Sequence, residues 1–225
     1  MVLIIRKNNI YDIERNFKMN EKVIGIDLAS SQSVVAIINE MGKPEVIANA
    51  EGKRLTPSVI LIDKDERKVG SAAQRQAVMK PKNTIALIKR FMGGKYTDEN
   101  IQKAIKYASF DVVNKNGRPY VKIDDREFSP EELSSYILTY MKQQAENYYG
   151  TEIKKAVITC PAFYNDDQRQ AVKLAGELAG LEVLRIINEP TAAILAATNI
   201  DLSKDKKILV VDLGGKSVCA SRVAA

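Results

Sequence analysis

The chain of 225 residues contains no histidine and no tryptophan, and only two cysteines. The absence of histidine excludes catalytic triads that use an imidazole base and metal sites that use imidazole ligands. Cys160 and Cys219 lie far apart and form no CxxC motif, so the sequence does not predict a disulfide framework. Any chemistry must therefore use carboxylates, lysine, hydroxyls and main-chain groups, and a reducing compartment such as the cytoplasm is the simplest location.

Long apolar runs and a one-sided charge pattern are also missing. No run approaches the roughly 20 apolar residues that a bilayer-spanning helix needs, so no membrane association is predicted. The net charge is +6, from 34 basic and 28 acidic residues, but the two signs are interspersed. Neither a basic stripe nor basic residues interleaved with aromatics occurs, which argues against a nucleic-acid partner. Residues 1–20 lack the apolar stretch of a signal peptide, and we treat them as an extension of unknown role.

The chain does contain one motif twice, over residues 23–39 and 208–225. In each copy an apolar run ends at an aspartate, Asp27 or Asp212, passes through small and hydroxyl residues, and becomes apolar again. This pattern is typical of a hairpin whose turn lets a phosphate approach main-chain N–H groups, with the aspartate facing a hydrated cation. The repetition predicts two halves facing one nucleotide. Because the second copy reaches the last residue, we expect much of the second half to lie outside this chain.

Periodicity and turn signals predict a meander of strands followed by a mixed insertion over about residues 55–130. The meander strands are expected over 22–27, 33–39 and 44–47. The insertion is expected to hold strands over 57–62 and 68–69, helices over 71–79, 83–91 and 97–106, and a hairpin over 111–123. Thr97 is the expected start of the third helix, and Asn116-Gly117 the expected hairpin turn.

A strong helix start follows the insertion. Ser129 provides a hydroxyl N-cap, Pro130 the first helical position and Glu132 the glutamate of a capping box, with Gly150 as the stop. From residue 155 strand and helix then alternate, as in parallel crossover units. The strands are expected over 155–160, 182–187 and 207–212, and the helices over 166–179 and 190–197. The predicted fold class is therefore α/β, a ribonuclease-H-like lobe with a mixed sheet, flanking helices and a small inserted α+β subdomain.

Six segments in this order resemble the nucleotide-binding domain of DnaK-type heat-shock-seventy chaperones, members of the actin-like ATPase superfamily. They are IGIDL at 24–28, ANAEGKRLTPSV at 48–59, KNTIALIKRFMG at 82–93, VITCPAFYNDDQRQA at 157–171, AGLEVLRIINEPTAA at 179–193 and VVDLGG at 210–215. AGLEVLRIINEPTAA is the most specific of them, whereas IDL or DLGG alone would carry little. The resemblance implies a first ATPase lobe over 21–207 and the start of a second lobe over 208–225.

The resemblance also implies roles for individual residues. Asp27 and Asp212 would hold magnesium through water molecules. Lys89 would contact the transferred phosphoryl group of ATP, and Glu189 would orient the attacking water or the hydration shell of the metal. Phosphoryl transfer depends on positioning and charge neutralisation, so a lysine, a metal and carboxylates suffice without histidine.

Two phosphate-binding loops would hold the nucleotide, ATP or ADP. They comprise Ser30, Ser31 and Gln32 in the first copy of the motif, and Gly214, Gly215, Lys216 and Ser217 in the second. Both depart from the family pattern. Ala29 stands where the family has glycine, Lys216 where it has a third glycine, and Cys219 where it has an aspartate, so we expect weakened nucleotide handling.

Partner sites are implied as well. Pro161 and Arg169 match the family's proline switch and the arginine that relays nucleotide state. Arg185 and Asn188 match positions that engage J-domain co-chaperones or the surface between lobes. Client proteins are expected only if a substrate domain exists elsewhere.

Several alternatives remain open at this stage. Asp27 and Asp212 could cap local N–H groups, Lys89 could be a surface cation on a helix, and Glu189 could be a helix-entry carboxylate. Pro161 could simply end a strand. The leading function is an ATP-binding chaperone ATPase; the contrasting one is a non-catalytic remnant or regulatory module that binds co-chaperones. A sugar kinase of the same superfamily is disfavoured because residues 157–193 resemble chaperones specifically.

Overall fold

A mixed β-sheet forms the centre of the computed structural model, which describes residues 22–197, 207–214 and 218–224. Its strands are β1 (Val23–Asp27), β2 (Gln32–Ile38), β3 (Pro44–Val46), β11 (Lys155–Cys160) and β12 (Glu182–Asn188), in the order β12-β11-β1-β2-β3, with β4 (Thr56–Pro57) pairing with β2. The meander β1–β2–β3 is antiparallel, whereas β11 and β12 add in parallel beside β1. The predicted α/β class is confirmed, and the meander is followed by two parallel strands as expected. The strand predicted over 207–212 as a third parallel unit does not join this sheet.

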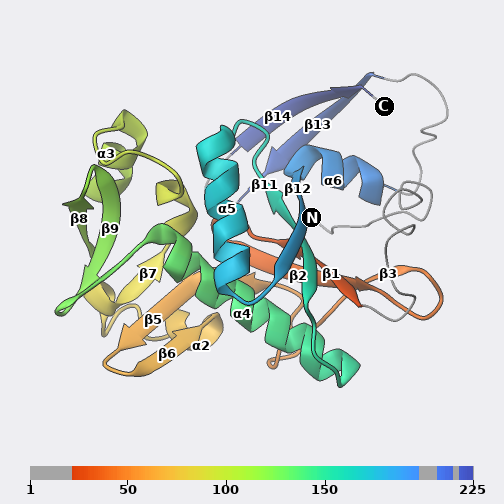
Figure 1. Ribbon diagram of the computed structural model, residues 1–225, viewed down its shortest axis with the longest axis horizontal. Helices are drawn as coiled ribbons and strands as arrows, with labels where there is room; N and C mark the ends of the chain where they lie inside the picture. Colours follow the sequence, from red (N-terminus) through yellow and green to blue (C-terminus); the bar gives the residue numbers. More distant parts are fainter. Residues whose placement is uncertain (1–21, 198–206, 215–217, 225) are drawn as a thin grey trace.

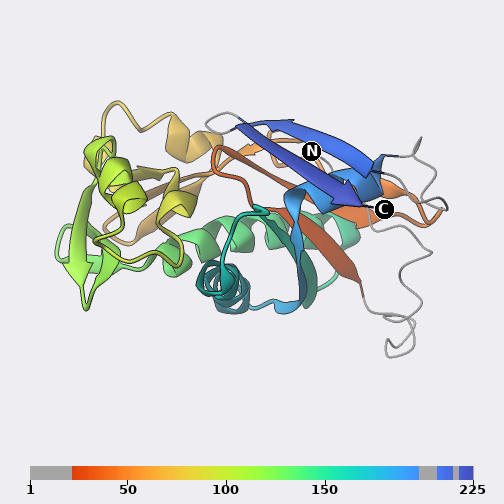
Figure 2. The ribbon, with the colours of Figure 1, turned by 90° about the horizontal axis from the view of Figure 1, so that it is seen from above.

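Both faces of this sheet are covered by helices, which explains why its inner strands are continuous apolar runs. Successive residues of a strand point to opposite faces. Ile158 belongs to the main core together with Val172 of α5 (Asp166–Leu178), whereas Val157 packs with Ala192 of α6 (Glu189–Ala196). Helices α5 and α6 therefore lie on opposite faces, and Figure 2 shows α6 on the side away from α5.

Helix α4 (Pro130–Tyr149) connects the sheet to the inserted part of the chain. It begins with the predicted capping box, in which the Ser129 side chain accepts from the main chain of Glu132 and the Glu132 carboxylate accepts from Ser129 N–H. It ends at Gly150, whose φ of 66° is left-handed. The helix contacts β1 and β2 of the central sheet and β5, β6 and β9 of the inserted part, so it packs against both (Figure 1).

The inserted part contains two small three-stranded sheets. One has the order β6-β5-β7 and the other β10-β9-β8. Its elements are β5 (Val59–Asp63), β6 (Glu66–Val69), α2 (Ser71–Gln74), η2 (Pro81–Asn83), β7 (Thr84–Ala86), η3 (Ile88–Phe91), α3 (Glu99–Lys106), β8 (Asp111–Lys115), β9 (Arg118–Ile123) and β10 (Arg126–Phe128). The predicted Asn-Gly hairpin is present, with positive φ at Asn116 and Gly117.

The helix predicted over 83–91 is wrong. Thr84 and Ile85 are buried because β7 pairs with β5, so tertiary pairing overrides the local helical pattern. Leu87 then takes a left-handed conformation, φ 59° and ψ 26°, which interrupts any helical path before the short 3-10 turn η3. Two other predicted helices differ in smaller ways. Of the helix predicted over 71–79, only α2 forms. Helix α3 begins after Asp98 rather than after Thr97. Strand β10 was not predicted.

The second copy of the repeated motif is a hairpin like the first. Strands β13 (Lys207–Leu213) and β14 (Val218–Ala224) pair antiparallel, and α6 packs against both of them.

The extension over 1–20 lies outside the described residues. Within the described part of the chain, none of the helices has the length and apolar character needed to span a membrane.

Candidate functional site

The first aspartate of the repeated motif lies at the end of β1, on the α6 face of the sheet. Asp27 is only 5% exposed. Ile26 of β1 is in register with Ile158 of β11, so the next residue of β11, Thr159, lies beside Asp27. Thr159 donates from Oγ1 to Asp27 Oδ1 at 2.6 Å. Burial raises the pKa of Asp27, while the hydrogen bond from Thr159 and the positive charge of Lys89 oppose that rise. The pairing of β1 with β11 thus fixes the orientation of the Asp27 carboxylate, and Thr159 and Lys89 partly offset the cost of its negative charge.

Lys89, from the inserted part of the chain, lies within electrostatic range of this carboxylate. Its side chain is 4% exposed, so it is not a surface cation. The ammonium donates to the Leu28 carbonyl, in the loop after β1, and to Glu189 Oε1 at 2.7 Å. The hydroxyl of Tyr164 donates to the Lys89 carbonyl at 2.9 Å and so holds the main chain of η3 in place. Three distant segments meet at this one lysine.

Glu189 is the first residue of α6, directly after β12, and it completes the charged cluster. Burial raises the pKa of Glu189, the Lys89 ammonium lowers it, and the charges of Asp27 and Asp212 raise it further. The half-buried Asp212 on β13 also raises the pKa of Asp27. The structure therefore brings all four predicted residues within electrostatic range, with three carboxylates against one ammonium.

The loop after Asp27 is held by a serine from the next segment. Ser58 donates from Oγ to the Ala29 carbonyl at 2.7 Å and from its main chain to the Ser31 carbonyl at 2.9 Å. The side chains of Ser30 and Ser31 are half-buried, and among the described residues their hydroxyls have no hydrogen-bond partner. Gln32 is exposed at the start of β2. Ser58 therefore holds the main chain of the loop in place, and the Ser30 and Ser31 hydroxyls are left available to a ligand.

The structure describes only the first residue of the second loop. Gly214 is exposed after β13, and Gly215, Lys216 and Ser217 lie outside the described residues. Cys219 lies on β14 in register with Asp212.

A protein-family model described as "Hsp70 protein" matches residues 23–224. The chain belongs to the Hsp70 family. The match spans nearly all of the described chain, from β1 to β14, and includes the four clustered charges. ATPase domains of this family generally bind ATP or ADP with magnesium, and the family supports a chaperone and ATPase type of function.

The predicted switch residues of this Hsp70-family chain adjoin the charged cluster. Pro161 directly follows β11, and Arg169 of α5 donates to three acceptors around it. These are Tyr164 O at 3.1 Å, Cys160 Sγ at 3.2 Å and Ala162 O at 3.4 Å. Burial raises the pKa of the Cys160 thiol, which makes it a packed, neutral group. Since Tyr164 also bonds to Lys89, Arg169 is two contacts away from the lysine.

The two predicted partner residues lie at different depths. Arg185 is exposed on β12, the edge strand of the central sheet. Asn188 ends that strand as the N-cap position of α6, makes no side-chain cap, and accepts from Cys160 Sγ at 3.9 Å. Arg185 is therefore the more accessible of the two, whereas Asn188 is half-buried.

Sequence reasoning missed Thr159, Ser58 and Tyr164. Thr159 could have been found as a hydroxyl in an otherwise apolar strand next to the one that carries Asp27. Ser58 follows a proline in an apolar run and gave no comparable signal. Tyr164 lay within the segment 157–171 used for the resemblance, but nothing local points to its contact with Lys89, which is 75 residues away.

Proposed function

We propose that this Hsp70-family chain binds ATP with magnesium between the turns of its two repeated hairpins and hydrolyses it. One observation carries the proposal: Lys89, buried at 4% exposure, bonds to Glu189 and to the loop that follows Asp27. A buried ion pair costs desolvation energy and adds little stability, so its presence favours a functional reason.

The charge of the cluster fits a magnesium ion. Asp27, Glu189 and Asp212 place three carboxyl groups near the single positive charge of Lys89, and a divalent cation would favour their ionised forms. Oxygen ligands suit magnesium, which usually keeps several waters and binds through one or two carboxylates and the substrate phosphates. Accordingly, the described residues contain no group of three or more ligands that would enclose a metal directly. When bound, magnesium would neutralise charge on the phosphates, held through water by Asp27 and Asp212.

The remaining residues have separate tasks in this proposal. Lys89 places a positive charge on the phosphoryl group, and Glu189 accepts a hydrogen bond from the water that attacks it. Ser30 and Ser31 offer hydroxyl donors to the phosphates. Gln32 flanks them in the first loop, and Gly214, Gly215, Lys216 and Ser217 form the second loop. Thr159 and Ser58 act as positioning residues for Asp27 and the first loop.

We further propose that nucleotide state is transmitted through Pro161 and Arg169. The chain of contacts from Lys89 through Tyr164 to Arg169 supports this route. Arg185 and Asn188 are proposed to engage a J-domain co-chaperone, with Arg185 as the exposed contact. Client binding requires a substrate domain in addition to the residues described.

The test compares Lys89→Met with the exposed control Lys103→Met, whose side chain is 63% exposed in α3. Loss of one preorganised charge at the reacting group commonly costs about 100-fold in rate. We expect Lys89→Met to bind magnesium-ATP within a few-fold of the unmodified chain but to hydrolyse it at least about 100-fold more slowly. Calorimetry gives the affinity, and phosphate release gives the rate.

Two other outcomes have clear meanings. Equal hydrolysis by Lys89→Met would remove Lys89 from the mechanism. Magnesium-ATP binding without hydrolysis in the unmodified chain would favour the regulatory module over the enzyme, in keeping with Ala29 and Lys216 in the phosphate loops.

A further inference from the structure

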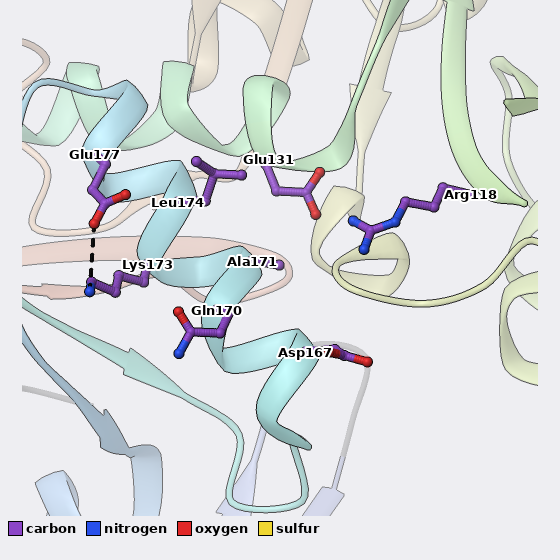
Figure 3. A pocket seen from close by; sticks show the side chains of 8 residues that line it. All are labelled: Arg118, Glu131, Asp167, Gln170, Ala171, Lys173, Leu174 and Glu177. Carbon is purple, nitrogen blue, oxygen red and sulfur yellow. Dashed lines mark ion pairs between the residues drawn. The ribbon is translucent and has the colours of Figure 1, made fainter. Parts of the chain in front are cut away.

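A second candidate site lies between α4, α5 and β9, away from the charged cluster. It is a cavity of about 330 Å³, lined by Arg118 of β9, Glu131 of α4 and a row of α5 residues (Figure 3). The lining includes Asp167 and Leu174 of α5. At 3.6 residues per turn, Arg169 points about 200° around the helix from Asp167, toward the proposed switch rather than the cavity. The cavity is therefore distinct from the nucleotide site.

Glu131 is the unusual residue of this cavity. It is only 6% exposed, yet among the described residues its carboxylate has no hydrogen bond and no ion pair. The neighbouring capping box is formed by Ser129 and Glu132 and does not use it. Its carboxylate oxygens face the cavity and are not sealed from water, since no buried side-chain oxygen of the described residues lacks a hydrogen-bond partner. A ligand ammonium group in the cavity would give this carboxylate a charge-assisted hydrogen bond.

An arginine faces Glu131 across the cavity without contacting it. Figure 3 shows the Arg118 guanidinium and the Glu131 carboxylate pointing toward each other from β9 and α4. No ion pair within 4.0 Å joins them, and within the described part of the chain Arg118 has no other acidic partner. Lys173 and Glu177 do pair with each other, at 3.7 Å. Among the described residues, the cavity thus presents one cation without an ion pair, Arg118, and two carboxylates without one, Glu131 and the exposed Asp167.

We propose that this cavity binds a free α-amino acid with an apolar side chain. The ligand's ammonium group donates to the Glu131 carboxylate, and its carboxylate accepts from the planar guanidinium of Arg118, a geometry that favours two parallel hydrogen bonds. Its side chain lies over Leu174, which is 46% exposed on α5. A volume of about 330 Å³ is at the lower end of small-molecule sites and suits a ligand of this size.

The test uses L-leucine, titrated into the full chain without nucleotide and followed by calorimetry and backbone-amide NMR. Isoamylamine lacks its carboxylate, and isocaproate lacks its ammonium group. We expect L-leucine to bind with a dissociation constant of the order of 1 mM or below, and each analogue to bind at least about tenfold more weakly. Glu131→Gln and Arg118→Gln should each weaken L-leucine binding at least about tenfold.

Glu152→Gln, an exposed glutamate outside the cavity, is the matched control and should leave the affinity unchanged. Arg118 is exposed, so Arg118→Gln should fold normally and keeps the test valid if Glu131→Gln does not. No binding of L-leucine at about 10 mM would overturn the proposal. Isoamylamine binding as tightly as L-leucine would also overturn it, because the cavity would then be a simple cation site.

Discussion

At the level of single residues, Asp27 is a carboxylate placed where water is scarce. It is 5% exposed, and burial is the main reason that its pKa is raised. The folded protein therefore holds this proton to a higher pH than the unfolded chain does. As pH rises from the ordinary value of 3.8 through the raised folded value, the free energy of unfolding falls. Ionisation of Asp27 in the folded protein thus costs stability, and a bound cation would offset this cost.

Asp27→Asn should remove this cost. The amide keeps an oxygen to accept the hydrogen bond from Thr159, so only the buried charge is lost. Without nucleotide or magnesium, we expect the variant to be more stable at pH 7 by about 1–2 kcal/mol, and the gain to vanish below the ordinary aspartate pKa. Urea denaturation at several pH values measures it. The exposed Asp125→Asn is the control, and a gain that did not depend on pH would contradict the explanation.

At the level of elements, the position of Lys89 depends on how η3 packs against the start of α5. Gly93 follows η3 with φ +63°, and a Cβ built on it would lie 2.6 Å from Gln168 Cα and 2.8 Å from Gln168 N. These are main-chain atoms in the first turn of α5, which Asn165 caps. Neither main chain can move without shifting a whole element. The contact between Gly93 and Gln168 therefore fixes how η3, which carries Lys89, packs against α5, which carries Arg169.

Gly93→Ala should therefore be unusually destabilising. We expect a loss of about 2–4 kcal/mol in the free energy of unfolding, from the left-handed backbone and the steric overlap together. Gly52→Ala is the matched control, because Gly52 has φ +73° but nothing within 4 Å of its Cβ position. It should lose only about 1 kcal/mol. Similar losses at the two sites, measured by urea denaturation, would show that packing against α5 is unimportant.

At the level of the whole molecule, the two copies of the repeated hairpin have different surroundings. The first is inside the central sheet, with β11 on one side and β3 on the other. The second forms a sheet of only two described strands, packed against α6, and three of its apolar side chains are exposed by more than half. They are Leu209 at 70%, Val211 at 56% and Leu213 at 75%. A hairpin with so little burial has little of its own to stabilise it.

Amide hydrogen exchange should separate the two hairpins. Main-chain amides of β13 and β14 should exchange at least about 100-fold faster than those of β1 and β11, because local opening exposes them without unfolding the core. Protection of the second hairpin equal to that of β11, in a chain shown to be monomeric, would contradict this expectation.

Local signals determined much of this protein. Apolar runs bounded by turn residues located β1, β2 and β11, because burial on both faces leaves a continuous pattern. A similar run located β13, although alternate side chains of that strand are exposed. Caps such as Ser129 and Asn165 fixed helix starts, since a cap is a contact between residues three positions apart. The family segments placed Asp27, Lys89, Glu189 and Asp212 in one candidate site, although their roles remain predictions.

Only the tertiary structure decided how those residues meet. Residues 84–86 form a strand because β5 offers a partner, and a local helical pattern carries no information about that partner. Lys89 bonds to Leu28 and to Glu189, which are 61 and 100 residues away, and Thr159 supports Asp27 across 132 residues. Burial, which raises the pKa of Asp27, arises only when distant elements pack. The sequence by itself determined which chemical groups are present and which short segments hold them, whereas long-range packing decided which groups lose water and whose charge they meet.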